Sequence, residues 1–160
     1  MRIGFGYDVH RFGPGHSVRL GGVTVAHSQG VVAHSDGDVL LHALMDALLG
    51  AAALGDIGLH FPPGDARHAG ADSRVLLRDV AARVAARGLA VENCDLTLVA
   101  EAPRIGVHRE VICMTIAADL GIARDRVNLK ATTAEGLGAL GRSEGLAAHA
   151  VVLLRATHDG

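Results

Sequence analysis

The stretch Ile3-Gly4-Phe5-Gly6-Tyr7-Asp8-Val9-His10-Arg11-Phe12 decides how the chain folds around its chemistry. Side chains alternate between the two faces of a β-strand, so the odd-numbered residues of this stretch share one face and the even-numbered residues share the other. The odd face is apolar except for Arg11. The even face carries Asp8 and His10, and the neighbouring glycines leave space beside them. The stretch therefore predicts a strand over 3–12 with an acid and an imidazole on its open face.

The rest of the chain predicts further elements from apolar periodicity, capping residues and glycines. They are a hairpin over 17–25 around Gly21-Gly22, helices over 38–54, 73–87 and 107–120, and strands over 94–101, 126–133 and 147–156. Loops are expected over 56–70 and 134–146. This order predicts an α/β (α+β) fold: a two-layer sandwich with a mixed β-sheet covered on one face by helices. We expect residues 1–160 to form a single domain.

Composition sets the class of protein. Of the 160 residues, 49% are hydrophobic and 20% are charged, which is enough apolar material for a core and excludes intrinsic disorder. Aromatic residues make up only 2%, so the core must be aliphatic. The mean hydropathy of +0.31 is high for a monomer of this size. This value indicates that some apolar surface is buried between subunits.

Charge and targeting signals exclude other classes. The 15 basic and 17 acidic residues are scattered without a basic run, so no nucleic-acid partner is expected. The longest apolar stretch, over 39–54, is too short to span a bilayer, and Met1-Arg2 leads directly into a strand, so neither a membrane contact nor a signal peptide is expected. Cys94 and Cys113 do not form a metal-type pair or imply a disulfide framework. A cytoplasmic location follows as an expectation.

A candidate metal site emerges from the strand and the first helix. Asp8 and His10 leave the same face of the strand, while Asp38, His42 and Asp46 form one stripe on a helix that is otherwise apolar. His42 is a candidate third ligand, with Asp38 or Asp46 behind it. Two imidazoles and one carboxylate leave a tetrahedral Zn²⁺ one open position, which is the pattern of a catalytic site. The alternatives are a polar strand face in water and a core histidine with one hydrogen bond.

Two segments are candidates for binding phosphate. Within His34-Ser35-Asp36-Gly37-Asp38, Ser35 or Asp36 is expected to cap the following helix, whose free N–H groups would attract an anion, and His34 is a candidate donor. Within the segment 130–138, hydroxyl groups and backbone N–H groups can hold a diphosphate, and Glu135 can ligate Mg²⁺. Arg142 adds a guanidinium for an anion. A plain capping loop and a glycine-rich hairpin remain the alternatives.

The loop after the first helix suits a polyol. It contains Asp56-Ile57-Gly58 and Phe61-Pro62-Pro63-Gly64-Asp65, whose two acids can hold hydroxyl groups, although a surface turn explains it equally well. Together these patterns leave three functions open: a Zn²⁺/Mg²⁺ phosphoryl-transfer enzyme, a metal-dependent phosphohydrolase of a nucleotide-linked polyol, and a non-enzymatic metal or nucleotide-binding module. Residue spacing alone does not separate the first two.

The motifs resemble those of one known family over nearly the whole chain. Gly6-Tyr7-Asp8-Val9-His10, the run 33–38 with His42, and Gly55-Asp56-Ile57-Gly58 are similar to the 2-C-methyl-D-erythritol 2,4-cyclodiphosphate synthase family. So are Ala71-Asp72-Ser73, Lys130-Ala131-Thr132-Thr133 with Glu135, and Gly141-Arg142-x-Glu144-Gly145. The resemblance implies a lyase (a cyclase) of non-mevalonate isoprenoid biosynthesis. Its reaction would convert 4-diphosphocytidyl-2-C-methyl-D-erythritol 2-phosphate into the cyclic diphosphate and release CMP.

The resemblance also implies roles for individual residues. Asp8, His10 and His42 would hold Zn²⁺, Glu135 would hold Mg²⁺ or Mn²⁺, and His34 and Thr133 would act in catalysis by positioning the phosphates. The other implied substrate contacts are Ser35, Asp56, Ile57, Gly58, Phe61 and Asp65 around the methylerythritol, Ala100, Arg104, Ile105, Gly106, Ala131 and Thr132 around the cytosine, and Arg142. The implied assembly is a homotrimer with active sites between subunits. Pro63, Ala134 and Ala139 depart from the commonest family pattern, and none of them is a metal ligand.

Overall fold

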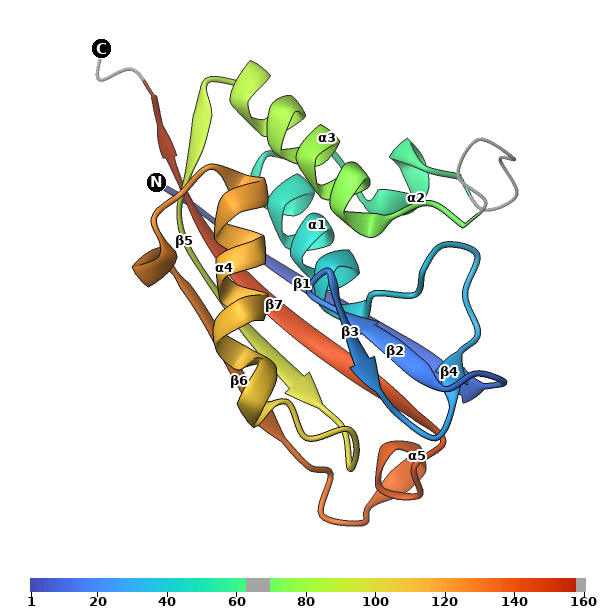
Figure 1. Cartoon of the computed structure of the whole chain (residues 1–160). Helices are drawn as coiled ribbons and strands as arrows, with labels where there is room; N and C mark the ends of the chain where they lie inside the picture. The colour runs from blue at the N-terminus through green and yellow to red at the C-terminus, as the bar shows by residue number, and fades with distance from the viewer. Residues whose placement is uncertain (63–69, 158–160) are drawn as a thin grey trace.

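The computed structural model describes residues 1–62 and 70–157. Its main sheet has the strand order β4-β1-β7-β5-β6 (Figure 1). The bounds are Gly30–Val31 for β4, Arg2–Gly13 for β1, Gly145–Ala156 for β7, Leu89–Val99 for β5 and Val127–Thr132 for β6. The β5–β6 pair is parallel and the other pairs are antiparallel, so the predicted mixed sheet is confirmed.

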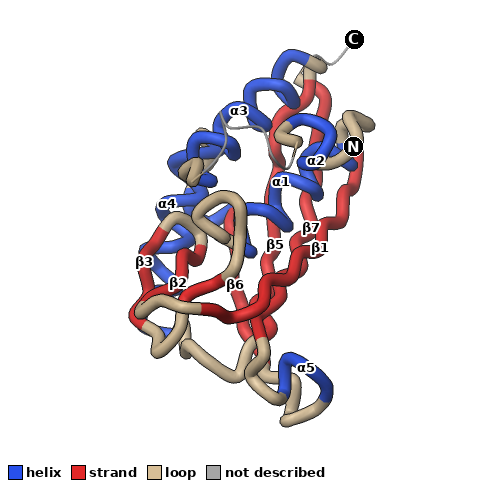
Figure 2. The backbone as a smooth tube through the Cα atoms, turned by 90° about the vertical axis from the view of Figure 1, so that its right-hand side faces the viewer, coloured by secondary structure: helices blue, strands red, loops and turns tan. Residues whose placement is uncertain are grey.

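The long helices lie on one side of this sheet, as Figure 2 shows. They are α1 (Val39–Ala51), α3 (Ser73–Ala86) and α4 (Arg109–Leu120). The strands β2 (Ser17–Leu20) and β3 (Val23–Ala26) form a separate hairpin, and β2 contacts α1. Among the described residues, no helix combines the length and the apolar character needed to cross a membrane.

Helix α1 is buried on nearly all sides because β1 and β7 lie beneath it while α3 and β2 contact its flanks. Two glycines of β1 let the backbone of α1 approach the strand. A Cβ atom on Gly4 would lie 1.9 Å from the carbonyl oxygen of Ala47, and one on Gly6 would lie 1.9 Å from that of Ala43. This close packing sets His42 of α1 opposite the even-numbered side chains of β1.

The alternation predicted for β1 is present in the structure. Gly4 and Gly6 are buried beneath α1, whereas Ile3, Phe5, Tyr7 and Val9 are 74%, 62%, 47% and 48% exposed. On the neighbouring strand β7, the imidazole of His149 lies 5.8 Å from the ring of Phe5 and 5.0 Å from that of Tyr7, measured between ring centroids. The face of the sheet opposite the helices therefore carries an exposed apolar row along β1.

Several predicted boundaries are wrong for local reasons. Helix α1 ends at Ala51 rather than residue 54, because Ala53 and Gly55 adopt positive φ angles of 57° and 84°. Strands β5 and β7 begin earlier than predicted, at Leu89 and Gly145. The third predicted long helix starts with a 3-10 turn, η2 (Gly106–His108), before α4. A second such turn, η3 (Arg124–Arg126), precedes β6.

Three short elements lie where no regular structure was predicted. They are β4, α2 (Ile57–His60) and α5 (Gly138–Gly141). Each spans at most four residues, which is too short for a periodic apolar pattern to mark it. Cys94 and Cys113 are buried free thiols, and burial raises the pKa of Cys94 to about 12, so this side chain acts as a small apolar core residue.

Candidate metal centre and phosphate sites

Asp8, His10 and His42 converge on one point between β1 and α1. The Asp8 Oδ2 atom lies 3.0 Å from His10 Nε2 and 3.0 Å from His42 Nδ1, and the two nitrogen atoms are 3.1 Å apart. His42 is buried, and the other two side chains are half-buried. The structure therefore brings the three candidate ligands together as an almost equilateral triangle of donor atoms.

The triangle matches the donor set of a zinc ion. Tetrahedral Zn²⁺ binds nitrogen and oxygen ligands at about 2.0–2.1 Å, which separates neighbouring ligand atoms by roughly 3.3 Å. The observed separations of 3.0–3.1 Å are close to that value. Two imidazoles and one carboxylate also leave one coordination position for water or substrate. The residues present thus fit a catalytic zinc.

Opposing effects set the charge of this triad. Burial would raise the pKa of Asp8, but hydrogen bonds with His10 and His42 outweigh it and hold that pKa well below its usual range. Burial would lower the pKa of His42, but the hydrogen bond and the charge of Asp8 outweigh it and raise that pKa. Asp8 is therefore ionised at neutral pH, which is the form that binds a metal ion.

The outer nitrogen of His42 contacts two serines rather than an acid. Its Nε2 atom lies 3.1 Å from Ser73 Oγ and 3.1 Å from Ser35 Oγ. Ser73 Oγ in turn donates a hydrogen bond to Asp36 Oδ1 at 2.5 Å. Ser73 was not predicted as a partner of His42, because it lies 31 residues away and no local sequence pattern connects the two.

The prediction that Asp38 or Asp46 stands behind His42 is wrong. The carboxylate of Asp38 accepts hydrogen bonds from the backbone N–H groups of Gly21, Gly22 and Leu41 at 2.9, 2.7 and 3.1 Å. That of Asp46 accepts one from the backbone N–H of Ile57 at 2.8 Å. The spacing correctly places the three side chains on one helix face, but each lies a full turn from the next and meets a different neighbour.

The predicted cap of α1 is also wrong. Asp38 caps the helix, while Asp36 accepts hydrogen bonds from the N–H and the hydroxyl of Ser73 at the start of α3. The N–H groups of Gly37 and Asp38 are directed to Ser35 Oγ and Asp36 Oδ1. These two donors, and the N–H of Leu41 that is bonded to Asp38 Oδ1, are therefore not free for an anion. His34 is exposed in the segment before them.

The polyol-loop candidates lie around α2. Asp56 caps this helix by accepting a hydrogen bond from Leu59 N at 2.9 Å, and Asp46 anchors it to α1 through Ile57. Ile57 and Gly58 are therefore held at a defined position next to α1. Phe61 follows directly, with the Arg83 guanidinium 6.0 Å from the centre of its ring. The candidate Asp65, and Pro63, lie outside the described residues.

A second group of candidates gathers at the carboxyl ends of the parallel strands β5 and β6. The backbone register pairs Leu98 with Ala131, and Ala100 N donates to Thr132 O at 3.1 Å. This pairing places Ala100 beside Thr132, and the candidates Arg104, Ile105 and Gly106 follow Ala100 in the loop after β5. In the loop that follows, Thr133 Oγ1 donates to Glu135 Oε1 at 3.1 Å, and Glu135 is exposed.

Glu101 organises the loop after β6. Its Oε1 atom accepts hydrogen bonds from the backbone N–H groups of Ala134 and Gly136 at 3.0 and 3.4 Å. The prediction that the N–H groups of this loop are open to a diphosphate is therefore wrong for these two. The sequence signal for Glu101 was weak: it is an acid at the end of a strand, 33 and 35 residues from its partners.

Strand β7 separates β1, which carries Asp8 and His10, from β5 and β6 in the sheet. Across residues 1–62 and 70–157, no hydrogen bond or ion pair joins Asp8, His10 or His42 to the segments 100–106 and 131–135. The last candidate, Arg142, lies just after α5, and its Nε donates to Glu144 Oε1 at 2.7 Å. One chain thus presents a metal half and a phosphate half separately.

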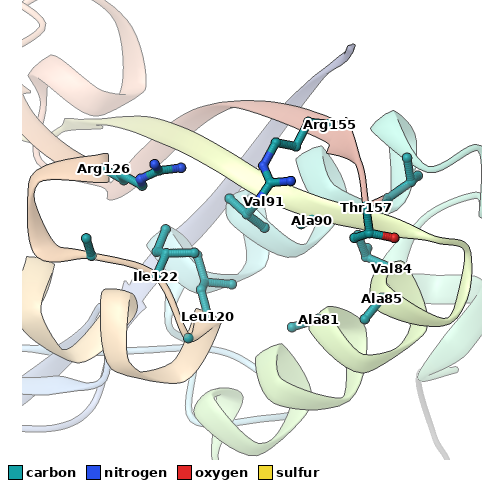
Figure 3. Close-up of a pocket in the computed structure, with 13 residues that line it drawn as sticks. Ala81, Val84, Ala85, Ala90, Val91, Leu120, Ile122, Arg126, Arg155 and Thr157 are labelled. Atoms are coloured by element: carbon teal, nitrogen blue, oxygen red, sulfur yellow. The ribbon is translucent and has the colours of Figure 1, made fainter. Parts of the chain in front are cut away.

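A hollow of about 400 Å³ between α3, α4 and β5 is unrelated to either group (Figure 3). Its lining is mainly aliphatic, with Arg126 and Arg155 at one side. Both guanidinium groups form ion pairs with Glu92, at 3.0 and 2.9 Å. None of the residues that line this hollow is a candidate site residue.

Comparisons with known proteins agree with the resemblance seen in the motifs. The model of the YgbB family matches residues 1–155. A 2-C-methyl-D-erythritol 2,4-cyclodiphosphate synthase from Pseudomonas aeruginosa is 64% identical over 156 residues, covering 98% of this chain and 99% of the relative.

Solved structures share the fold. An IspF from Plasmodium falciparum in a CDP complex has a TM-score of 0.86 and 31% identity, covering 98% of this chain and 97% of that one. The bifunctional IspDF from Campylobacter jejuni has a TM-score of 0.93 and 41% identity. That match covers 97% of this chain but only 42% of the longer bifunctional chain. The chain therefore belongs to the YgbB family of 2-C-methyl-D-erythritol 2,4-cyclodiphosphate synthases.

Proposed function

We propose that this chain cyclises 4-diphosphocytidyl-2-C-methyl-D-erythritol 2-phosphate to 2-C-methyl-D-erythritol 2,4-cyclodiphosphate with release of CMP, a step of non-mevalonate isoprenoid biosynthesis. The observation that carries the proposal is the triad of Asp8, His10 and His42 within a chain that matches a synthase of that name over 98% of its length. Such a triad suits phosphoryl transfer, because a metal ion neutralises charge on the transferring group.

Asp8, His10 and His42 would hold Zn²⁺. When bound, this ion would supply a Lewis acid that polarises a phosphoryl oxygen. The donor triangle of 3.0–3.1 Å supports the assignment, as does the ionised state of Asp8. His34, exposed beside Ser35, would direct its imidazole toward a charged phosphate oxygen.

The reaction needs little acid–base chemistry from the protein. An oxygen of the 2-phosphate attacks the β-phosphorus, forming the ring, while the bond from that phosphorus to the CMP oxygen breaks and CMP leaves. The attacking oxygen is already ionised, so no protein base has to remove a proton. Catalysis then rests on alignment of the two ends of one substrate and on exclusion of water. Thr133 and His34 are the proposed residues for this alignment.

Two pockets would hold the ends of the substrate. Ser35, Asp56, Ile57, Gly58 and Phe61, together with Asp65, would surround the methylerythritol phosphate. Ala100, Arg104, Ile105, Gly106, Ala131 and Thr132 would surround the cytosine, and Arg142 would provide a further anion contact. The parallel pairing of β5 with β6 supports the second pocket, because it brings Ala100 and Thr132 together at the carboxyl ends of the two strands.

Glu135 is the proposed ligand for Mg²⁺ or Mn²⁺ between the phosphates, since these ions prefer carboxylate oxygen. Changing Glu135 to Gln should raise the Mg²⁺ concentration needed for half-maximal turnover by at least about tenfold, because one anionic ligand is lost. Zinc content should stay at the level of the unchanged protein. Titration of activity with Mg²⁺ and elemental analysis check the two parts. A variant that loses zinc and keeps its Mg²⁺ dependence would contradict this assignment.

The residues 1–160 are proposed to form one domain that assembles as a homotrimer, with active sites between subunits. Two features support this assembly. The exposed row of Ile3, Phe5, Tyr7 and Val9 offers apolar surface to another copy. The metal and phosphate halves are separate in one chain, so a neighbouring copy can complete the site.

Mixed assemblies test the shared site. At an Mg²⁺ concentration too low for Glu135→Gln, the His42→Ala and Glu135→Gln chains are each weakly active alone. Co-expression should restore activity, because some interfaces then combine an intact metal half with an intact phosphate half. We expect recovery of about a quarter of the original activity if equal amounts of the two chains mix at random, and about a third in purified mixed trimers. Sedimentation equilibrium should give the mass of three chains. No recovery from mixed trimers would place both halves of the site in one chain.

The reaction itself is tested by phosphorus NMR after incubation of the protein with the cytidylated substrate, Zn²⁺ and Mg²⁺. Two mutually coupled signals of a ring diphosphate, together with CMP, are expected. An open-chain methylerythritol phosphate with CMP would instead indicate a hydrolase. Absence of CMP from protein with full zinc occupancy would indicate a binding module.

A further inference from the structure

The environment of His42 restricts how its ring can carry a proton. A carboxylate can only accept hydrogen bonds, so Ser73 must donate its single hydroxyl proton to Asp36, 2.5 Å away. The lone pairs of Ser73 Oγ then remain to accept a hydrogen bond from His42 Nε2, which lies 3.1 Å away. When a metal ion occupies the triad, His42 therefore carries its proton on Nε2 and its lone pair on Nδ1. Without the metal, the Asp8 carboxylate 3.0 Å from Nδ1 favours a proton on Nδ1, and the Ser73 contact opposes that arrangement.

The second serine does not impose this restriction. Ser35 Oγ also lies 3.1 Å from His42 Nε2, but it accepts a hydrogen bond from Gly37 N at 3.3 Å and keeps its own proton free to rotate. Ser35 is also half-buried, whereas Ser73 is fully buried. Ser35 can serve as donor or acceptor, so only Ser73 fixes which nitrogen carries the proton.

Asp36 is held in place for this role. Its carboxylate also accepts the backbone N–H groups of Ser73 and Asp38 at 3.1 and 3.3 Å. The guanidinium of Arg19 on β2 forms an ion pair with Asp36 Oδ2 at 3.8 Å. The chain of contacts from Arg19 through Asp36 and Ser73 ends at the ring of His42, and Nδ1 of that ring points to Asp8 and His10.

We propose that Ser73 and Asp36 are positioning residues that keep the lone pair of His42 Nδ1 directed at the metal site. The inference rests on the zinc site of the proposed function but not on the reaction, because metal binding is measured without substrate. Groups that hydrogen-bond to a metal-bound imidazole typically change metal affinity by roughly 10- to 100-fold when they are removed.

The experiment compares zinc affinity in the full-length protein by competition with a chromophoric chelator. Ser73→Ala should weaken zinc binding by roughly 10- to 100-fold, because Ser35 can then donate to Nε2 and let the proton move to Nδ1. Ser35→Ala is the matched control, since it removes the other hydroxyl at the same 3.1 Å distance, and it should stay within about threefold of the original affinity. Equal losses in the two variants, or no loss in Ser73→Ala, would overturn the proposal.

A second measurement uses the unchanged protein, so the proposal can still be tested if Ser73→Ala fails to fold. In the zinc-loaded, ¹⁵N-histidine-labelled protein, His42 should show metal bound to Nδ1 and a slowly exchanging proton on Nε2. This proton should exchange faster in Ser73→Ala at saturating zinc, while the backbone N–H groups of α1 keep the exchange rates of the unchanged protein. Equal acceleration of both would reflect a loss of fold stability and would count against the role of Ser73. Metal on Nε2, or a rapidly exchanging proton in the unchanged protein, would refute the role of Ser73.

Discussion

Gly6→Ala is expected to prevent formation of the zinc site and to lower the free energy of unfolding by more than about 4 kcal/mol. Losses of this size are typical only of substitutions that severely disrupt the core. The added Cβ would lie 1.9 Å from the carbonyl oxygen of Ala43, which is backbone and cannot rotate away. Helix α1 would have to move off β1, and His42, the residue before Ala43, would move with it. Urea unfolding and the zinc content of the purified protein measure the two effects.

Gly50→Ala provides the control for this substitution. Gly50 lies in α1 itself, but a Cβ there meets no atom within 4 Å. Alanine is favoured over glycine in a helix by about 0.5–1 kcal/mol, so this variant should be as stable as the original protein or slightly more stable. If Gly6→Ala behaved like Gly50→Ala, the close contact between β1 and α1 would not be essential.

Asp8→Asn is expected to remove most bound zinc and to lower turnover by about 10³-fold. The amide keeps the shape of the side chain but lacks the charge that binds the metal, and a metal ion supplies several kcal/mol of charge stabilisation to a transition state. Elemental analysis and an assay of CMP release measure zinc and turnover separately. Full zinc with normal turnover in Asp8→Asn would show that the triad is not the metal site.

Asp46→Asn is the matched control for the loss of charge. Asp46 lies one turn after His42 on α1, but its carboxylate accepts the N–H of Ile57 rather than contacting the triad. The amide oxygen of asparagine can accept the same hydrogen bond, and zinc should be retained. Loss of zinc in both variants would point to a general electrostatic effect rather than to ligation by Asp8.

Features of the fold and site that depend on residues close together in the sequence could be predicted. The alternation over 3–12 predicts which side chains of β1 face α1, and the glycines at 4 and 6 mark where the helix backbone approaches. Asp8 and His10 could be paired because residues two apart on a strand share a face. His42 could be added because its helix is too apolar for an isolated imidazole to be ordinary surface.

Contacts between residues distant in sequence could not be predicted in the same way. The partner of His42 was expected on its own helix, but Ser73 comes from the start of α3. Likewise, Glu101 lies just after β5 and accepts hydrogen bonds from Ala134 and Gly136 in the loop after β6. These contacts depend on how the elements are arranged in space. The same is true of Asp38, which caps α1 and also binds the turn at Gly21-Gly22.

Because side chains alternate between the two faces of β1, a change in the number of residues in this strand has a different effect from a substitution within it. Insertion or deletion of one residue between Gly4 and Asp8 would shift the register, turn Phe5 and Tyr7 against α1, and expose the ligands on the opposite face. Exchange of an outward residue for another of similar size leaves Asp8 and His10 where they are. Over evolutionary time, the number of residues in this strand should therefore be harder to alter than the identity of those facing away from the helices.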